Sequence, residues 1–94
     1  MSDTLTLGLV QMASGADRGS NVQAVRALLG EAAGRCDLAV FPENVLCLGR
    51  GATVLASARP ICDLYAELGE LCRDAGLAAV FGGVPVAEGG KAMN

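Results

Sequence analysis

Residues 37–44 read Asp-Leu-Ala-Val-Phe-Pro-Glu-Asn, and the fold can be inferred outward from this stretch. Its apolar run, residues 38–41, is continuous, which is typical of a strand buried on both faces of a parallel sheet. Pro42 has no backbone N–H to donate and therefore ends the strand. Glu43 follows directly, so the sequence predicts a carboxylate at the carboxyl end of a buried strand, where reactive groups gather in open α/β sheets.

Helical periodicity lies on both sides of this stretch. An upstream helix is predicted between Asp17, a potential N-cap, and Gly34, which suits a left-handed exit. Pro60 fits the first turn of a second helix, which Gly76 ends. Residues 49–58 between them are expected to be irregular. The apolar stripes of the two helices are Val22, Val25, Leu28, Leu29 and Ala32, and Ile61, Leu64, Tyr65, Leu68, Leu71, Cys72 and Ala75.

Two further strands complete the predicted order. Thr4 to Met12 alternates without a charge on either face, which predicts a strand covered on both faces. Leu77 to Phe81 predicts a third strand, and the tail from Val84 begins as strand or loop. The order β-α-β-loop-α-β favours an α/β fold with a parallel sheet. Three strands and two helices cannot cover both sheet faces, so we expect a single, partial domain over residues 1–94.

Composition excludes several classes of function. The chain has 94 residues, 52% of them hydrophobic, and a net charge of −3, so it offers no basic surface for nucleic acid or an anionic membrane. It has no histidine, which removes Ser-His and Cys-His catalysis. No uncharged stretch is long enough to span a bilayer, and Met1-Ser2-Asp3 does not begin a secretory signal. We therefore expect a cytoplasmic protein with reduced cysteines.

Glu43 is the candidate catalytic residue. Its neighbours Val40, Phe41, Val45 and Leu46 are apolar, and a carboxylate held among them would be desolvated, which makes it a better general base near neutrality. The alternatives are a solvated loop acid or an acid that caps the turn through a backbone N–H.

The cysteines and the first loop have simpler interpretations than catalytic ones. Cys47 lies four residues after Glu43 and could pair with it as a nucleophile, but a small buried apolar role fits better, because a bare carboxylate hinders ionisation of a thiol. Cys36, Cys62 and Cys72 are expected in the core, and their spacing does not suit a metal.

The loop 14–20 matches no phosphate-binding motif, so it predicts a capped turn. Lys91 is expected to be a solvated tail lysine.

These pieces, in this order and spacing, resemble the N-terminal part of the nitrilase superfamily of carbon–nitrogen hydrolases, over nearly the whole chain. Residues 7–12 look like its opening strand, and Asn21 with the following residues looks like its first helix. Residues 37–44 look like the strand and Phe-Pro-Glu motif that carries the catalytic glutamate. Residues 80–85 are similar to the next inner strand. Residues 90–94 resemble the segment before the following strand, from which Met93 departs because an aromatic residue often stands there.

The resemblance implies a four-layer α-β-β-α sandwich and hydrolysis of a small amide or a nitrile by a Glu-Lys-Cys triad, without a metal or organic cofactor. Glu43 maps onto the general base. The lysine and the nucleophilic cysteine would lie beyond Asn94, because Lys91 and Cys47 do not match their motifs, so we expect this chain alone to be almost inactive. Phe-Pro-Glu-Asn followed by Val45-Leu46-Cys47 looks closer to small-amidase branches, such as deaminated-glutathione amidase or omega-amidase. Family members commonly pair through helices, which implies a homodimer.

Two rival hypotheses belong to other classes of function. The apolar excess and the incomplete layers are compatible with a non-catalytic module that associates with a complementary chain or with itself. A nucleotide-binding α/β module shares the order of elements, but the glycine fingerprint of such modules is missing.

Overall fold

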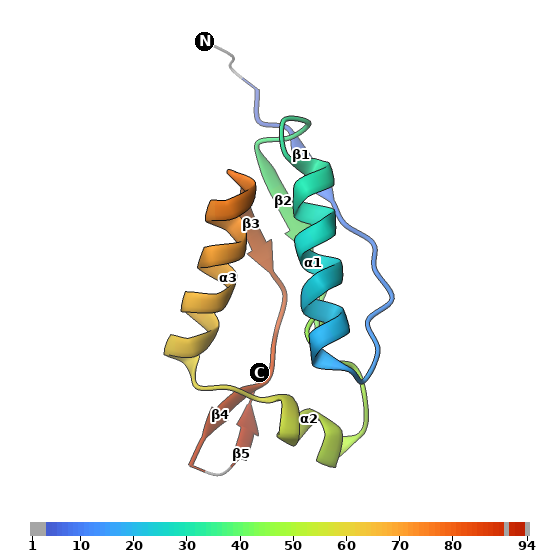
Figure 1. Ribbon diagram of the computed structural model, residues 1–94, viewed down its shortest axis with the longest axis vertical. Coiled ribbons are helices and arrows are strands. Elements are labelled where there is room, and N and C mark those ends of the chain that lie inside the picture. The colour runs from blue at the N-terminus through green and yellow to red at the C-terminus, as the bar shows by residue number, and fades with distance from the viewer. Residues whose placement is uncertain (1–3, 90, 94) are drawn as a thin grey trace.

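A computed structural model describes residues 4–89 and the backbone of residues 91–93. Its main sheet has three parallel strands in the order β1 (Leu7–Leu9), β2 (Leu38–Phe41) and β3 (Ala78–Phe81) (Figure 1). Helix α1 (Arg18–Ala32) connects β1 to β2, while α2 (Gly51–Ser57) and α3 (Ile61–Ala75) connect β2 to β3. The antiparallel strands β4 (Val86–Glu88) and β5 (Lys91–Met93) form a separate small hairpin. The predicted α/β class and parallel sheet are confirmed.

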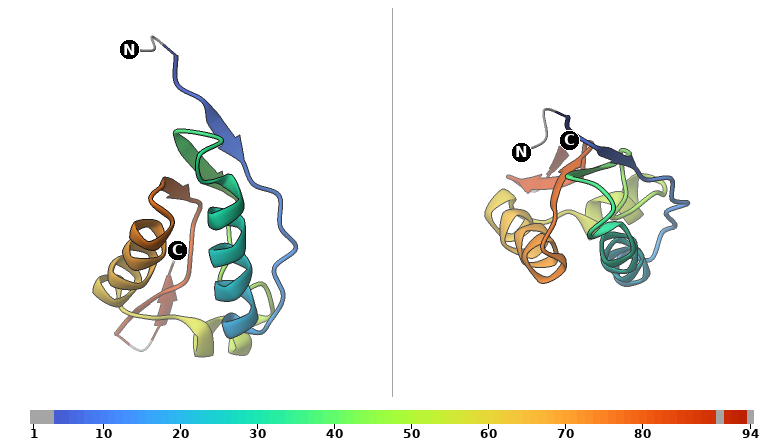
Figure 2. Two further views of the ribbon diagram at one scale, coloured as in Figure 1. Left: turned by 45° about the horizontal axis from the view of Figure 1, so that its top comes forward. Right: turned by 90° about the horizontal axis from the view of Figure 1, so that it is seen from above.

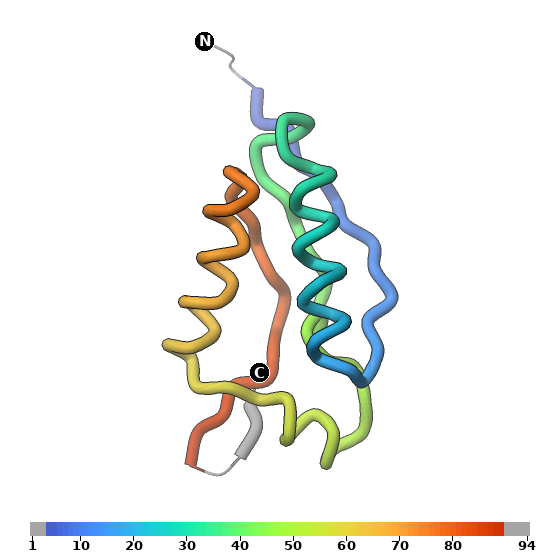
Figure 3. The backbone as a smooth tube through the Cα atoms, in the orientation of Figure 1, coloured from blue at the N-terminus to red at the C-terminus, as the bar shows by residue number. Residues whose placement is uncertain are grey.

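Helices α1 and α3 lie side by side on one face of the sheet (Figure 2). The two crossovers advance in the same direction, from β1 to β2 to β3, so crossovers of the same hand place their helices on the same face. The tube in Figure 3 follows the chain from β1 to the start of α1, which lies at the same end of the molecule as α2. Loops that follow β1, β2 and β3 are thereby gathered at the carboxyl ends of the strands.

The core fills the space between this helix pair and the sheet. The parallel register places Ala39 beside Ala79 and Phe41 beside Phe81, and the two phenylalanine rings stack with centroids 4.8 Å apart. The buried side chains of the core are Val25, Leu29, Ala39, Phe41, Val45, Leu46, Leu64, Leu71 and Leu77. Each main helix therefore contributes part of its apolar stripe to one shared core.

The opposite face of the sheet is apolar and uncovered within the described residues. Leu7 and Leu9 are 50% and 79% exposed, and Val80 on the other edge strand is 50% exposed. Leu38 and Val40, on the same face of β2, are only half-buried. The prediction that the first two strands are covered on both faces is therefore wrong for this structure, because both crossover helices lie on the same face.

Residues 49–58 are not irregular as predicted, because residues 51–57 form α2. The helix is short and has no buried side chain, so it leaves no periodic pattern in the sequence. Its carboxyl end is stabilised from the next residues: the Arg59 guanidinium donates to the carbonyl oxygens of Ala56, Ser57 and Ala58. Capping by a neighbouring side chain thus supports a helix that the pattern does not reveal.

The boundaries of α1 and α3 follow the local signals closely. Asp17 is the N-cap of α1, its carboxylate accepting from the Ser20 N–H, and Gly76 ends α3 with a φ of 67°. Gly34, with a φ of 80°, makes the turn after α1. The first strand is much shorter than the predicted Thr4 to Met12, since only its middle pairs with β2.

Helix α3 buries only part of its predicted stripe. Leu64 and Leu71 are buried, but Tyr65 is 74% exposed and Ile61 is also exposed, so only one side of the predicted stripe faces the core. No helix within residues 4–89 is both long and apolar enough to cross a membrane.

Candidate functional site

Glu43 lies at the carboxyl end of β2, in the segment that we call the Glu43 loop, residues 42–48. The loop is bonded to the exit of β3: the Asn44 N–H donates to the Gly83 carbonyl at 2.8 Å, and the Gly82 N–H donates to the Phe41 carbonyl at 3.3 Å. Glu43 therefore lies beside the ends of two adjacent parallel strands, at the edge where the sequence predicts it.

The first crossover loop and α1 hold the other end of the Glu43 loop. The Ser14 hydroxyl donates to the Val45 carbonyl at 2.9 Å, and the Leu48 N–H donates to the Gly15 carbonyl at 2.8 Å. These bonds join the ends of β1 and β2, so the backbone that carries Glu43 is fixed from both neighbouring strands.

Asn21, the buried polar side chain of α1, connects the same two loops. Its amide nitrogen donates to the Gly15 and Leu46 carbonyls at 2.8 and 2.9 Å, and its oxygen accepts from the Gly15 N–H at 3.0 Å. All its hydrogen-bonding groups face backbone, so a residue of another shape would leave buried backbone groups unpaired. Sequence reasoning placed Asn21 at the helix start but did not assign this role. The one available signal was the position of this polar residue on the apolar side of the helix.

The Glu43 residue itself is exposed. The expectation that apolar neighbours desolvate it is wrong for this structure. Phe41, Val45 and Leu46 are each at most 3% exposed because their side chains turn into the core, and they do not surround the carboxylate. The geometry thus confirms the position of Glu43 at the strand ends and not the apolar pocket around it.

The cysteines are free, and the predicted roles hold for most of them. Cys47 is fully buried, with its Sγ 3.7 Å from the Ala16 carbonyl oxygen, which confirms its structural interpretation. No hydrogen bond within the described part of the chain joins Cys47 to Glu43. Cys36 and Cys72 are half-buried beside the core, and burial raises the pKa of the Cys72 thiol. The core prediction is wrong for Cys62, which is exposed because it lies on the outer side of α3.

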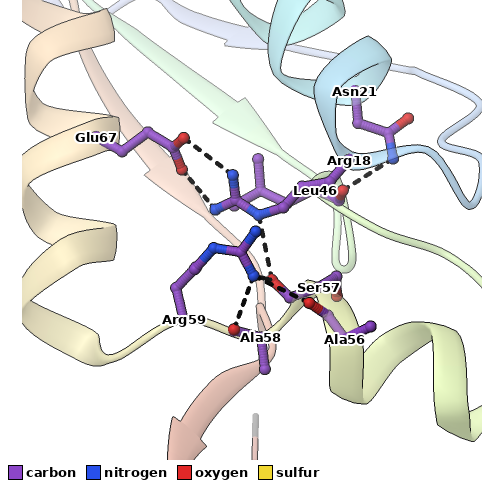
Figure 4. A network of polar contacts seen from close by, with 8 residues as sticks. All are labelled: Arg18, Asn21, Leu46, Ala56, Ser57, Ala58, Arg59 and Glu67. Atoms are coloured by element: carbon purple, nitrogen blue, oxygen red, sulfur yellow. Dashed lines mark hydrogen bonds and ion pairs between the residues drawn. The ribbon is translucent and has the colours of Figure 1, made fainter.

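An ion pair connects the start of α1 to the middle of α3 near the same end of the sheet (Figure 4). The Arg18 guanidinium donates to both carboxylate oxygens of Glu67, at 2.6 and 3.0 Å, and to the Ser57 carbonyl at 3.2 Å. Hydrogen bonding by Arg18 holds the pKa of Glu67 below its ordinary value of 4.5. Sequence reasoning missed this pair, because 49 residues separate its members and no local pattern relates them.

Neither a metal cluster nor a phosphate-type loop emerges among the described residues. No group of three or more Asp, Glu or Cys side chains is gathered there in a way that could hold a metal ion. The loop 14–20 is the capped turn that the sequence predicts: the pKa of Asp17 is lowered by hydrogen bonds from the Ser20 hydroxyl and backbone. The side chain of Lys91 lies outside the described residues.

One of two comparisons with known proteins gave a match. The family model for carbon–nitrogen hydrolases matches residues 6–94. The match spans the main sheet, its helices and the Glu43 loop. A comparison with curated proteins found no match.

Proposed function

Because the chain belongs to the carbon–nitrogen hydrolase family, we propose that its function is hydrolysis of a small amide with Glu43 as the general base. The observation that supports this proposal is the position of Glu43, which stands at the shared carboxyl edge of β2 and β3 on a loop bonded to both neighbouring strand ends. A general base needs such a fixed place, because proton transfer is efficient only within hydrogen-bonding reach.

The proposed chemistry divides the reaction among three groups. Glu43 accepts the proton of the cysteine thiol, and the thiolate attacks the amide carbonyl carbon. A lysine ammonium stabilises the oxyanion, after which the C–N bond breaks and the amine leaves with the proton. Water then hydrolyses the thioester. Of this triad we assign only Glu43 within the chain, so we propose that residues 1–94 alone have almost no amidase activity.

Several finer assignments extend the proposal. We propose that the enzyme belongs to a small-amidase branch, because its Phe-Pro-Glu motif and the following residues Asn44-Val45-Leu46-Cys47 resemble the corresponding segment of those branches. We also propose that residues 1–94 are a single partial domain of a cytoplasmic enzyme that pairs as a homodimer and needs no cofactor.

The test uses a chain extended beyond Asn94 with the lysine and cysteine motifs of the family. Glu43→Gln keeps the shape of the side chain but removes its basicity, and we expect kcat to fall by about 10²–10⁴-fold, the usual contribution of a general base. Glu31→Gln is the control, because Glu31 is an exposed carboxylate on α1, away from the carboxyl edge. A Glu43→Gln enzyme with the parent kcat would show that the base is another group.

The uncovered sheet face favours a second candidate function, which is association with another copy of the chain. Leu5, Leu7, Leu9 and Val80 are all at least half exposed on or beside this face, and soluble monomers rarely expose such a contiguous apolar patch. Stacking two such faces would remove these side chains from water on both copies.

The oligomeric state of variants in solution tests this second candidate. We expect the parent chain to associate in sedimentation experiments and the double variant Leu7→Ser, Leu9→Ser to be monomeric. Leu55→Ser is the matched control, since Leu55 is 48% exposed on α2, away from the face, and should leave association unchanged. A parent chain that stays monomeric at high concentration would exclude self-association and leave the uncovered face to a different partner.

A further inference from the structure

The exits of β2 and β3 approach each other so closely that no side chain fits at Gly82. A Cβ atom built there would lie 2.8 Å from the Glu43 nitrogen, 2.9 Å from the Glu43 Cα and 2.9 Å from the Pro42 carbonyl carbon. All three are backbone atoms, which cannot move aside as a flexible side chain can. Gly82 does not have a positive φ, so lack of space and not backbone conformation requires a glycine here.

The residue after Glu43 has an unusual backbone as well. Within the described residues, Asn44 is the only residue other than glycine with a positive φ, of 57°. Asparagine tolerates this left-handed region better than other side chains do. The Asn44 N–H donates to the Gly83 carbonyl at 2.8 Å, so the turn that carries Glu43 is bonded to the residue next to Gly82.

We propose that Gly82 and Asn44 are positioning residues for Glu43, and this inference rests on the general-base role proposed above. Gly82 lets the β3 exit lie directly against the Glu43 backbone, and Asn44 turns the chain so that its N–H bonds that exit. Together they set the point from which the Glu43 side chain leaves the sheet edge. Neither residue touches the reacting atoms; both act through the Glu43 backbone.

The experiment has a structural and a kinetic part. In the chain of residues 1–94, Gly82→Ala should shift the backbone amide resonances of Glu43 and Asn44 and speed hydrogen exchange of the Asn44 N–H. In the extended enzyme, it should lower kcat by about 10²-fold with little change in KM, because a displacement of about 1 Å is enough to misplace a catalytic group. Gly30→Ala is the control: a Cβ at Gly30, on the exposed side of α1, meets nothing within 4 Å, so neither measurement should change.

A second pair of variants covers the case in which Gly82→Ala does not fold. Asn44→Gly keeps the left-handed backbone accessible and should retain kcat, whereas Asn44→Ala strains it and should lower kcat in the folded enzyme. Equal kcat values for these two variants, or unmoved Glu43 and Asn44 resonances in Gly82→Ala, would overturn the inference. Failure of the proposed function would be seen separately, as an unchanged kcat in Glu43→Gln.

Discussion

Arg18 shows how one side chain can join elements that are distant in the sequence. Its guanidinium bonds Glu67 of α3 with both arms and also reaches the last residue of α2 (Figure 4). This two-armed geometry is stronger and more directional than a single charged contact. The Arg18 side chain is only 17% exposed, so the pair is better shielded than an ordinary surface ion pair.

The Arg18–Glu67 pair predicts a specific loss of stability in acid. The pKa of Glu67 is lowered on folding, so the pair stabilises the folded state fully above about pH 4.5, and this contribution is lost as the pH falls through the lowered pKa. We expect the free energy of unfolding in urea to fall more between pH 6 and pH 3 in the parent chain than in Glu67→Gln.

The Arg18→Gln background is the control for that prediction. Without the guanidinium, Glu67→Gln should change the acid dependence much less, because the Arg18 hydrogen bonds are the largest cause of the lowered pKa of Glu67 and only the charge of Arg59 still lowers it. An effect of Glu67→Gln as large as in the parent chain would show that Arg18 is not the main cause.

At the scale of elements, helix α1 is capped by good local signals but weakened by a glycine in its interior. Gly30 lies in the last turns of the helix on its exposed side, and a Cβ there would meet nothing within 4 Å. Gly34, four residues later, has a φ of 80°, in the region that side chains disfavour. Gly30 and Gly34 are thus close in sequence, but only Gly34 has a backbone conformation that disfavours a side chain.

Alanine substitution at these two positions should have opposite effects. We expect Gly30→Ala to raise the free energy of unfolding by about 0.5–1 kcal/mol, since alanine favours the helix interior. Gly34→Ala should lower it by about 1–2 kcal/mol, the cost of a left-handed residue with a side chain. Thermal or urea denaturation of both variants measures the difference, and effects of the same sign would contradict the assigned end of α1.

For the whole molecule, the main asymmetry lies between the two faces of the sheet. The face under α1 and α3 forms one apolar core, while the other presents leucine and valine side chains to solvent. For side chains of one type, the buried apolar area determines how much a residue contributes to stability. Two leucines of the same chain can therefore differ strongly in their contributions.

Leu71 and Leu9 make this difference measurable. Leu71 is 3% exposed and packs in the core, so Leu71→Ala should lower the free energy of unfolding by about 2–5 kcal/mol. Leu9 is 79% exposed, so Leu9→Ala should change it by less than about 0.5 kcal/mol at protein concentrations low enough to prevent association. A large loss in Leu9→Ala under these conditions would mean that this face is covered in solution.

The sequence by itself determined what depends on near neighbours along the chain. The extent of β2 follows from its apolar run and from Pro42, which ends the strand. The start of α1 follows from Asp17, and the limits of α3 follow from Pro60 and Gly76, because a helix cap depends on residues close in the sequence. The place of Glu43 at the carboxyl edge also follows, since the order of strands and helices implies a parallel sheet.

Only the tertiary structure decided what depends on which distant segments meet. The exposure of the Leu7 and Leu9 face depends on both helices lying on one side of the sheet, which no local pattern encodes. The exposure of Glu43 depends on its apolar neighbours turning into the core. The close contact of Gly82 with the Glu43 backbone and the Arg18–Glu67 pair likewise arise from packing between separate elements. Local patterns predict conformation, whereas burial and contact are set by the three-dimensional arrangement of the whole chain.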